Sequence, residues 1–293
     1  MENSTASYYA FSTNTHEFNL KYMSFGNPQG PPVIFIHGTP WSHKVWLPYA
    51  EALAPFYKVH LFDNPGFGVS LSGASISGRH ELDASLATQS DAFAYLFKHW
   101  NLSQPPHIIA HDVGGLISLR ANLLHGCDYA SLCLVDVVAL RPFGSPFFKL
   151  IGSHPDIFNA IPDPIAEGMV RSYIQGAAFK PLAKEVEDLL TFPWTKKGMQ
   201  CKGGFLRQIR QADQKHVAEV ESRYSEIGKK MPVKIIWGKQ DGWIPVESAS
   251  KLAGMIGTDQ VVIVEEAGHL IQYDQPIRLG VELAHWLAKV AQA

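Results

Sequence analysis

Short apolar runs alternate along the chain with longer segments in which apolar residues recur at helical spacing. The runs consist mainly of Val, Ile, Leu and Phe, and they are bounded by turn-forming residues such as Pro, Gly and Asp. Runs of this kind are typical of strands that are buried on both faces of a parallel sheet. We predict such strands at residues 33–36, 59–62, 108–110, 132–135, 233–237 and 261–264.

The segments between these runs include two clear amphipathic patterns, at residues 84–100 and 276–290. Strands that alternate with helices in this way predict a doubly wound, mostly parallel sheet of the α/β class. Residues 8–25 contain no helical pattern, so we predict that they form antiparallel strands at one edge of the sheet.

The alternation is interrupted between residues 139 and 227. This block contains no buried-strand run, and prolines divide it into short helical pieces. Residues 204–224 are predicted to form one longer helix, because their apolar residues recur at helical spacing. We therefore predict a core of residues 1–138 and 228–293 that carries a helical insertion at residues 139–227.

The composition of the chain excludes several classes of function. Of its 293 residues, 46% are hydrophobic and 18% are charged, which indicates a folded chain with a large core. The 25 basic and 27 acidic residues give a net charge of −2, which argues against a nucleic-acid partner. No apolar run approaches the roughly 20 residues of a membrane span, and residues 1–10 show no signal-peptide pattern. We expect a cytoplasmic protein with no membrane partner.

The three cysteines, Cys127, Cys133 and Cys201, form no CxxC pair. An odd number of widely spaced cysteines in a long chain indicates neither a disulfide framework nor a zinc site. We therefore expect free thiols and no metal.

Polar motifs follow the predicted strands, at the carboxyl ends where open parallel sheets bind ligands. The segment 37–40, His-Gly-Thr-Pro, follows the first strand. The segment 110–115, Ala-His-Asp-Val-Gly-Gly, matches the small-x-nucleophile-x-small pattern of a sharp strand-to-helix turn with Asp112 at its apex. Asp241 and His269 follow the last two strands, in the chain order nucleophile, acid, histidine.

With the segment 63–70, Asp-Asn-Pro-Gly-Phe-Gly-Val-Ser, these motifs occur in an order that resembles the α/β-hydrolase fold over the whole chain. The nucleophile position holds Asp112, preceded by His111. In this respect the chain resembles the branch that contains epoxide hydrolases and haloalkane or haloacetate dehalogenases. The resemblance implies that the insertion at 139–227 is a cap over the active site, and that no cofactor is needed.

A carboxylate is already ionised at neutral pH, so Asp112 is suited to displacing a leaving group from a saturated carbon. The resemblance implies an ester on Asp112, which a water activated by His269 then hydrolyses. Asp241 would orient His269, and the backbone N–H groups of Thr39 and Val113 would form the oxyanion hole.

A second acid is available in Asp136, which ends the strand after the turn helix. One dehalogenase subgroup of the resembling branch carries its catalytic acid at the corresponding strand end. We favour Asp241, because an acid after the strand at 233–237 is the commoner arrangement, and we keep Asp136 as the alternative.

The leaving group decides between the two activities of this branch. Related haloalkane dehalogenases carry a Trp next to the nucleophile and haloacetate dehalogenases an Arg, whereas this chain carries Val113. An epoxide needs a proton donor, and Tyr173, on a predicted helix at 165–178, is the candidate in the cap. His154 is a second possible donor. Trp41 and Trp243, beside the motif loops, are the candidates for the pocket wall.

The sequence therefore predicts a cofactor-free hydrolase that opens an epoxide to a diol. We expect a small apolar organic substrate and a monomer or homodimer. The alternatives are a haloalkane or haloacid dehalogenase, and a non-hydrolytic lyase, isomerase or small-ligand binder in which Asp112 forms no ester.

Overall fold

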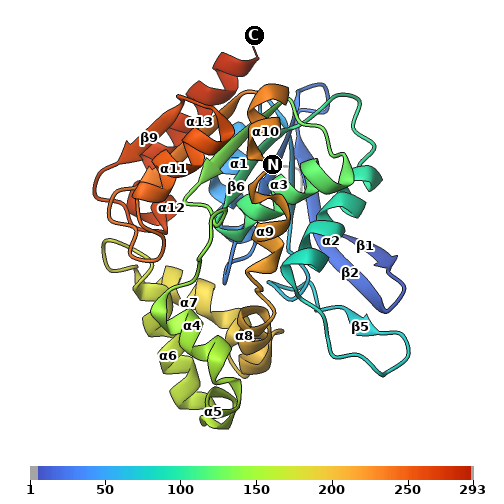
Figure 1. Ribbon diagram of the computed structural model, residues 1–293, viewed down its shortest axis with the longest axis vertical. Coiled ribbons are helices and arrows are strands. Elements are labelled where there is room, and N and C mark those ends of the chain that lie inside the picture. Colours follow the sequence, from blue (N-terminus) through green and yellow to red (C-terminus); the bar gives the residue numbers. More distant parts are fainter. Residues whose placement is uncertain (1–5, 292–293) are drawn as a thin grey trace.

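The computed structural model describes residues 6–291, and its centre is one nine-stranded sheet (Figure 1). The order across the sheet is β1-β2-β4-β3-β6-β7-β8-β9, and β5 pairs with β2. The strands are β1 (Ser7–Ser12), β2 (His16–Gly26), β3 (Pro32–Ile36), β4 (Lys58–Phe62), β5 (Ala74–Ser75), β6 (His107–His111), β7 (Ser131–Val135), β8 (Val233–Gly238) and β9 (Val261–Val264). The pairings from β4 to β9 are parallel, whereas β1 and β5 pair with β2 antiparallel.

This sheet confirms the predicted α/β class. The six predicted strands correspond to β3, β4, β6, β7, β8 and β9, and residues 8–25 form the antiparallel edge. The prediction of burial on both faces is wrong for β9, in which only Val264 is fully buried and Ile263 is 40% exposed. The physical reason is its position, because β9 ends the sheet and has a strand on one side only.

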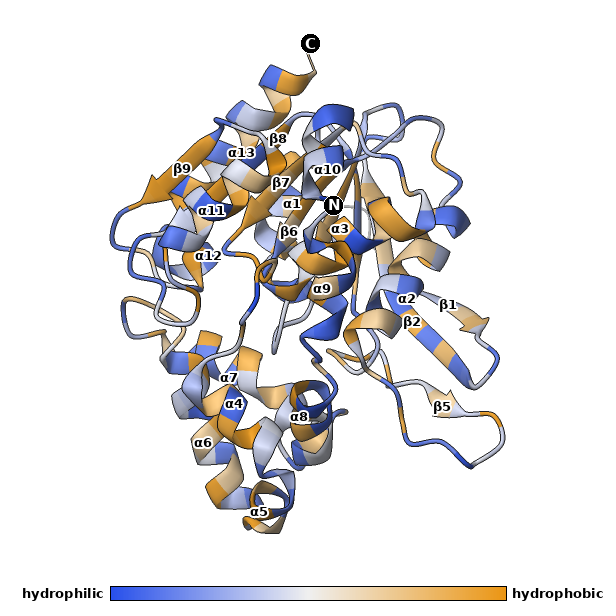
Figure 2. Cartoon of the chain, viewed as in Figure 1, coloured by the Kyte–Doolittle hydropathy of each residue, from blue (hydrophilic) through white to orange (hydrophobic). Residues whose placement is uncertain are grey.

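Helices cover both faces of the sheet, as the doubly wound class requires. Those that lie wholly within the predicted core ranges are η1 (His43–Val45), α1 (Leu47–Leu53), α2 (Leu86–His99), α3 (Val113–His125), α11 (Glu247–Ile256), α12 (Ile271–Asp274) and α13 (Pro276–Val290). Figure 2 shows mainly hydrophobic residues along β7 and β8, at the centre of the molecule.

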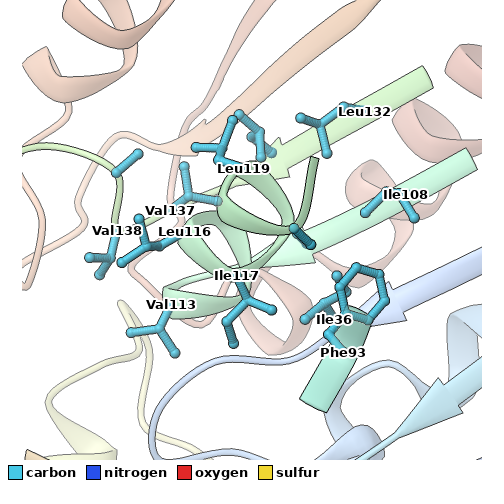
Figure 3. Packing of buried hydrophobic residues seen from close by; sticks show 14 of the residues in the cluster. Ile36, Phe93, Ile108, Val113, Leu116, Ile117, Leu119, Leu132, Val137 and Val138 are labelled. Atoms are coloured by element: carbon cyan, nitrogen blue, oxygen red, sulfur yellow. The ribbon is translucent and has the colours of Figure 1, made fainter. Parts of the chain in front are cut away.

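The helix α3 follows the predicted nucleophile, and apolar packing fixes its position. Figure 3 shows Leu116, Ile117 and Leu119 of α3 among side chains of neighbouring strands and loops, including Ile36 and Ile108. Residues 113–123 are buried without exception. The N-terminus of α3 is therefore held rigidly at the carboxyl ends of β3 and β6.

The structure describes the whole of the predicted insertion, residues 139–227, which forms helices and no strands. These helices form two groups. The helices α4 (Pro146–Ser153), α5 (Pro155–Ala160), α6 (Asp163–Gln175), α7 (Lys184–Thr191), η2 (Phe192–Trp194) and α8 (Cys201–Arg210) lie together at one end of the molecule (Figure 1). By contrast, α9 (Lys215–Glu221) and α10 (Tyr224–Lys230) pack on α3, and α10 also packs on α11. We call the first group the cap.

The helix predicted at 204–224 is therefore wrong as a single element. It divides into α8 and α9 at residues 211–214, where the chain passes from the cap to the core. Gln211 hydrogen-bonds there to the backbone of Ala84 and Leu82, and Gln214 to that of Phe143. These tertiary contacts hold residues 211–214 in a non-helical conformation, although the spacing of the apolar residues predicts a continuous helix.

Hydrogen bonds fix the cap against the core. The indole N–H of Trp194 donates to the Pro40 carbonyl over 3.0 Å, and the Gln200 amide donates to the Ser70 carbonyl over 3.0 Å. Both acceptors lie in motif loops, so the cap is held directly at the predicted site. Within residues 6–291, no helix combines the length and apolar character that crossing a membrane requires.

Candidate active site

Asp112 lies at the sharp turn between β6 and α3. Its backbone has φ 53° and ψ −128°, an unfavourable conformation for a residue with a side chain, and this conformation holds the carboxylate beyond the strand ends, where it is buried. The neighbouring glycines leave room for the turn. A Cβ on Gly114 would lie 2.7 Å from the Ile36 carbonyl oxygen, and a Cβ on Gly38 would lie 2.2 Å from the Asp112 Cβ.

The His269 ring lies between the two predicted carboxylates. Its Nε2 is 3.2 Å from Asp112 Oδ2, and its Nδ1 is 2.9 Å from Asp241 Oδ2. The second oxygen of Asp241 accepts hydrogen bonds from the backbone N–H groups of Trp243 and Ile244 over 2.8 and 2.9 Å. The acid is therefore fixed by its own loop, and it holds the imidazole in one orientation.

The opposite charges of Asp112 and His269 stabilise one another. Burial disfavours the ionised form of Asp112, but the closeness and charge of His269 hold its pKa below the usual range. Burial likewise disfavours the imidazolium, but Asp241 and Asp112 raise the pKa of His269 well above its usual value. The resting site thus holds an imidazolium between two carboxylates.

Asp136, the alternative acid, lies nearby in a different state. Its Oδ1 accepts a hydrogen bond from the Gly238 N–H over 2.7 Å, and its Oδ2 has no hydrogen-bond partner among the described residues. Burial, followed by the charge of Asp241, raises its pKa well above the usual range. Asp136 is therefore neutral beside these charged groups, and Asp241 is the acid that contacts His269.

One predicted oxyanion donor contacts the predicted nucleophile, Asp112. The Thr39 N–H donates to Asp112 Oδ1 over 2.7 Å. No hydrogen bond joins the Val113 N–H to this carboxylate in the part of the chain that the structure describes. Val113 nevertheless begins α3, whose N-terminal dipole favours negative charge at this point.

A cavity of about 30 Å³ lies beside Asp112, and the cap closes it. Tyr173 of α6 lines it together with Trp243, and their rings stack with centroids 4.2 Å apart. Burial raises the pKa of Tyr173, which keeps its hydroxyl protonated. This cavity holds little more than a water molecule, so a substrate must move lining side chains apart on binding.

Two sequence candidates lie away from this cavity. Trp41 is not among its lining residues; it is buried behind Trp243, against which it stacks with centroids 5.8 Å apart. The physical reason is that the loop after β3 turns inward, so that Trp41 belongs to the apolar core. His154 lies exposed between α4 and α5 and is also absent from the lining.

The cavity wall contains further residues that the sequence does not identify as site residues. They come from the chain after β7, from the start of the cap and from the loop after Asp241: Val138, Phe143, Gly144, Ser145, Phe148 and Ile244. Their residue types are those of an ordinary core. A signal that was available is Ser145 before Pro146, a pattern typical of a helix start, which indicates where the chain enters the cap.

His111 precedes Asp112, the predicted nucleophile, and contacts the main chain of His269. Burial, followed by the charge of His269, lowers its pKa to about 3, so the ring is neutral. Its Nε2–H donates to the backbone carbonyl of His269 over 2.8 Å. His111 therefore fixes the main chain that carries the catalytic histidine candidate. Among residues 6–291, no group of His, Cys, Asp or Glu has the arrangement of a metal site.

A model of the alpha/beta hydrolase family matches residues 33–282, and the chain belongs to this family. It is 26% identical over 273 residues to the dihydrolipoyllysine-residue acetyltransferase component of an acetoin cleaving system from Pseudomonas putida, covering 92% of this chain and 67% of that protein. It is 24% identical over 260 residues to a pimeloyl-acyl-carrier-protein methyl ester esterase from Vibrio campbellii, covering 86% of this chain and 91% of the esterase.

Solved structures agree with this assignment. An alpha/beta hydrolase fold protein from Burkholderia ambifaria superposes with a TM-score of 0.83 at 33% identity, covering 94% of this chain and 99% of that one. The haloalkane dehalogenase DbeA from Bradyrhizobium elkani has a TM-score of 0.78 at 16% identity over 98% and 99% of the two chains, a likeness of fold alone. The protein is a hydrolase of the α/β family. Which bond it hydrolyses depends on the chemistry of the site.

Proposed function

We propose that this protein opens epoxides to diols through an ester formed on Asp112, without a cofactor. The observation that carries the proposal is the nucleophile itself. Thr39 N–H holds one oxygen of the Asp112 carboxylate, and the other oxygen lies beside His269. A serine at this point would need a base before it attacked, whereas an ionised aspartate attacks a saturated carbon directly.

In the first step, Asp112 Oδ2 attacks an epoxide carbon, and the ring carbon–oxygen bond breaks. Tyr173, which lines the same cavity, gives its proton to the departing oxygen. The products are an ester between Asp112 and the substrate carbon, an alcohol on the neighbouring carbon and a Tyr173 phenolate. A positioned acid of this kind contributes typically about 10²–10⁴-fold to the rate.

Ester formation changes the charge balance around His269. It removes the negative charge of Asp112, which is one of the groups that raise the pKa of His269. The pKa of His269 therefore falls, and its proton passes to the Tyr173 phenolate. His269 becomes a neutral base only once the ester exists, which sets the order of the two steps.

In the second step, His269 takes a proton from water, and the hydroxide adds to Asp112 Cγ. The Thr39 N–H stabilises the oxyanion, and the Val113 N–H at the start of α3 is the second donor. When the tetrahedral centre collapses, the bond from Cγ to Oδ2 breaks, and Oδ2 leaves with the substrate carbon to which it became bonded in the first step, while the hydroxide oxygen stays in the carboxyl group. The released alkoxide takes the proton of the new Asp112 carboxylic acid, so the diol leaves and the site regains its starting charges.

The two steps are separated by His269→Gln. This variant retains the nucleophile but lacks the base of the second step, so a terminal epoxide such as 1,2-epoxyhexane should add once and remain bound. Intact-mass spectrometry should show one equivalent of adduct, and peptide mapping should place it on Asp112. The matched control is His285→Gln, an exposed histidine of α13, which should turn over and show no adduct.

Two results would contradict the proposal. One is a His269→Gln variant without adduct while the wild-type protein hydrolyses the same epoxide. The other is halide release from 1-chlorohexane without diol formation from any epoxide, which would assign the protein to the dehalogenase alternative. Asp112→Ala should abolish both adduct and turnover.

A further inference from the structure

A second cavity, of about 410 Å³, adjoins the catalytic cavity. The two share Val138, Phe143, Gly144, Ser145, Trp243 and Ile244 as lining residues. The larger cavity extends from this shared wall between the start of the cap and the helix α11. These shared side chains form the wall between the two cavities, so moving them apart on substrate binding would join the second cavity to the space beside Asp112.

The charged side chains that line the second cavity are all cationic. They are Arg141, Lys149 of α4 and Lys251 of α11, and no Asp or Glu is among the lining residues. Arg141 is neutralised, because its Nε donates to Glu221 over 2.9 Å. Lys149 and Lys251 form no ion pair with any described residue, and Glu247, one turn before Lys251, does not line the cavity.

A third cavity, of about 490 Å³, provides a comparison on the other side of Tyr173 and Trp243. It also shares Ser145 with the catalytic cavity, but its other walls carry no ionisable group: Pro146, Phe147, Met169, Ser172, Gly176 and Gly242. Of these two cavities, both of which share wall residues with the catalytic cavity, only the second is lined by cationic side chains. The third cavity is lined by uncharged side chains, whereas the second is lined by two unpaired ammonium groups. This difference favours a substrate with one uncharged end and one anionic end.

We propose that the substrate carries a carboxylate, which Lys149 and Lys251 bind while the electrophilic carbon lies at Asp112. This inference rests on the proposed function and narrows its substrate class to epoxides of organic acids. It replaces the wholly apolar substrate that the sequence suggests. A carboxylate fits this cavity better than a phosphate. The guanidinium group of Arg141, which would suit a phosphate, is already paired with Glu221.

The test compares two substrates that differ only in charge, an ω-epoxy medium-chain carboxylic acid and its primary amide. Wild-type protein should prefer the acid in kcat/KM. In Lys149→Ala/Lys251→Ala, the value for the acid should fall roughly three- to thirtyfold, as expected for two exposed ion pairs, and that for the amide should not change. The preference should also shrink in 0.5 M NaCl. The control Lys229→Ala/Lys230→Ala removes the same charge from the end of α10.

Binding without catalysis separates this inference from the proposed function. Octanoate should bind the wild-type protein more tightly than octanamide in isothermal titration, and the double lysine variant should lose the difference. If no epoxide reacts but octanoate still binds through these lysines, the reaction is wrong and the anion site stands. If acid and amide react equally in wild type and variant, the anion site is wrong and the epoxide hydrolase stands.

Discussion

At the scale of single residues, two acids are candidates to orient His269, and their environments differ. Asp241 is bonded to His269 Nδ1, whereas burial and the charge of Asp241 raise the pKa of Asp136 well above its usual range. We predict that Asp241→Asn slows ester hydrolysis by roughly 10³–10⁴-fold, because an amide neither fixes the tautomer nor stabilises the imidazolium. Single-turnover measurements of ester decay check this value.

Asp136→Asn is the matched variant. A neutral carboxylic acid and an amide have nearly the same shape, and the Asn oxygen can still accept from the Gly238 N–H. We expect less than a tenfold change in the same decay rate. A large loss in Asp136→Asn together with a small loss in Asp241→Asn would transfer the acid role to Asp136.

At the scale of elements, Asp63 joins the end of β4 to the start of η1 and to its own motif loop, residues 63–70. Its carboxylate accepts from the His43 backbone N–H and ring Nδ1 over 2.9 and 2.7 Å, and from the Val69 N–H over 3.2 Å. Burial opposes ionisation, but the charge and hydrogen bonds of His43 prevail and lower the Asp63 pKa from 3.8 to about 2. The start of η1 and the loop after β4 are therefore held together by one buried carboxylate.

This pKa sets the sign of a pH effect on stability. A carboxyl with a lowered pKa in the folded state stabilises the fold above its unfolded value of 3.8, and this contribution is lost as the pH falls towards 2. Asp63→Asn should therefore lower the free energy of unfolding by about 2 kcal/mol at pH 7, with a difference that shrinks below about pH 4. Urea titrations across this range measure it.

The control for this experiment is Asp128→Asn, which changes an exposed carboxylate outside these loops. It should leave the stability and its pH dependence close to those of the wild type. An Asp63→Asn variant that is equally destabilised at pH 7 and pH 3 would show that the carboxylate charge contributes nothing.

At the scale of the whole molecule, the sequence predicts those parts of the fold whose local residue pattern is itself set by their position in the structure. The buried runs of β3, β6, β7 and β8 are apolar because both faces of the sheet are covered, and the turn at Asp112 needs small neighbours because Gly114 touches the end of β3. These constraints act within a few residues, so they can be read from the chain.

The rest depends on distant contacts. The pairing of Val135 with Ile236 brings Asp136 and Asp241 to one sheet edge, so only the loop geometry selects the acid that meets His269. The cavity wall arises when the cap folds back over the strand ends. Ser145 and Phe143 therefore belong to the site through the packing of the whole chain; the sequence around Ser145 indicates only the start of a helix.

The central claim, that Asp112 and not water attacks the substrate carbon, is tested most directly by isotope labelling. Excess wild-type protein is reacted once with an epoxide in H₂¹⁸O, and the diol and the peptide containing Asp112 are analysed by mass spectrometry. The account predicts an unlabelled diol and ¹⁸O in the Asp112 carboxylate, because hydroxide attacks Cγ. A labelled diol together with an unlabelled Asp112 would contradict it.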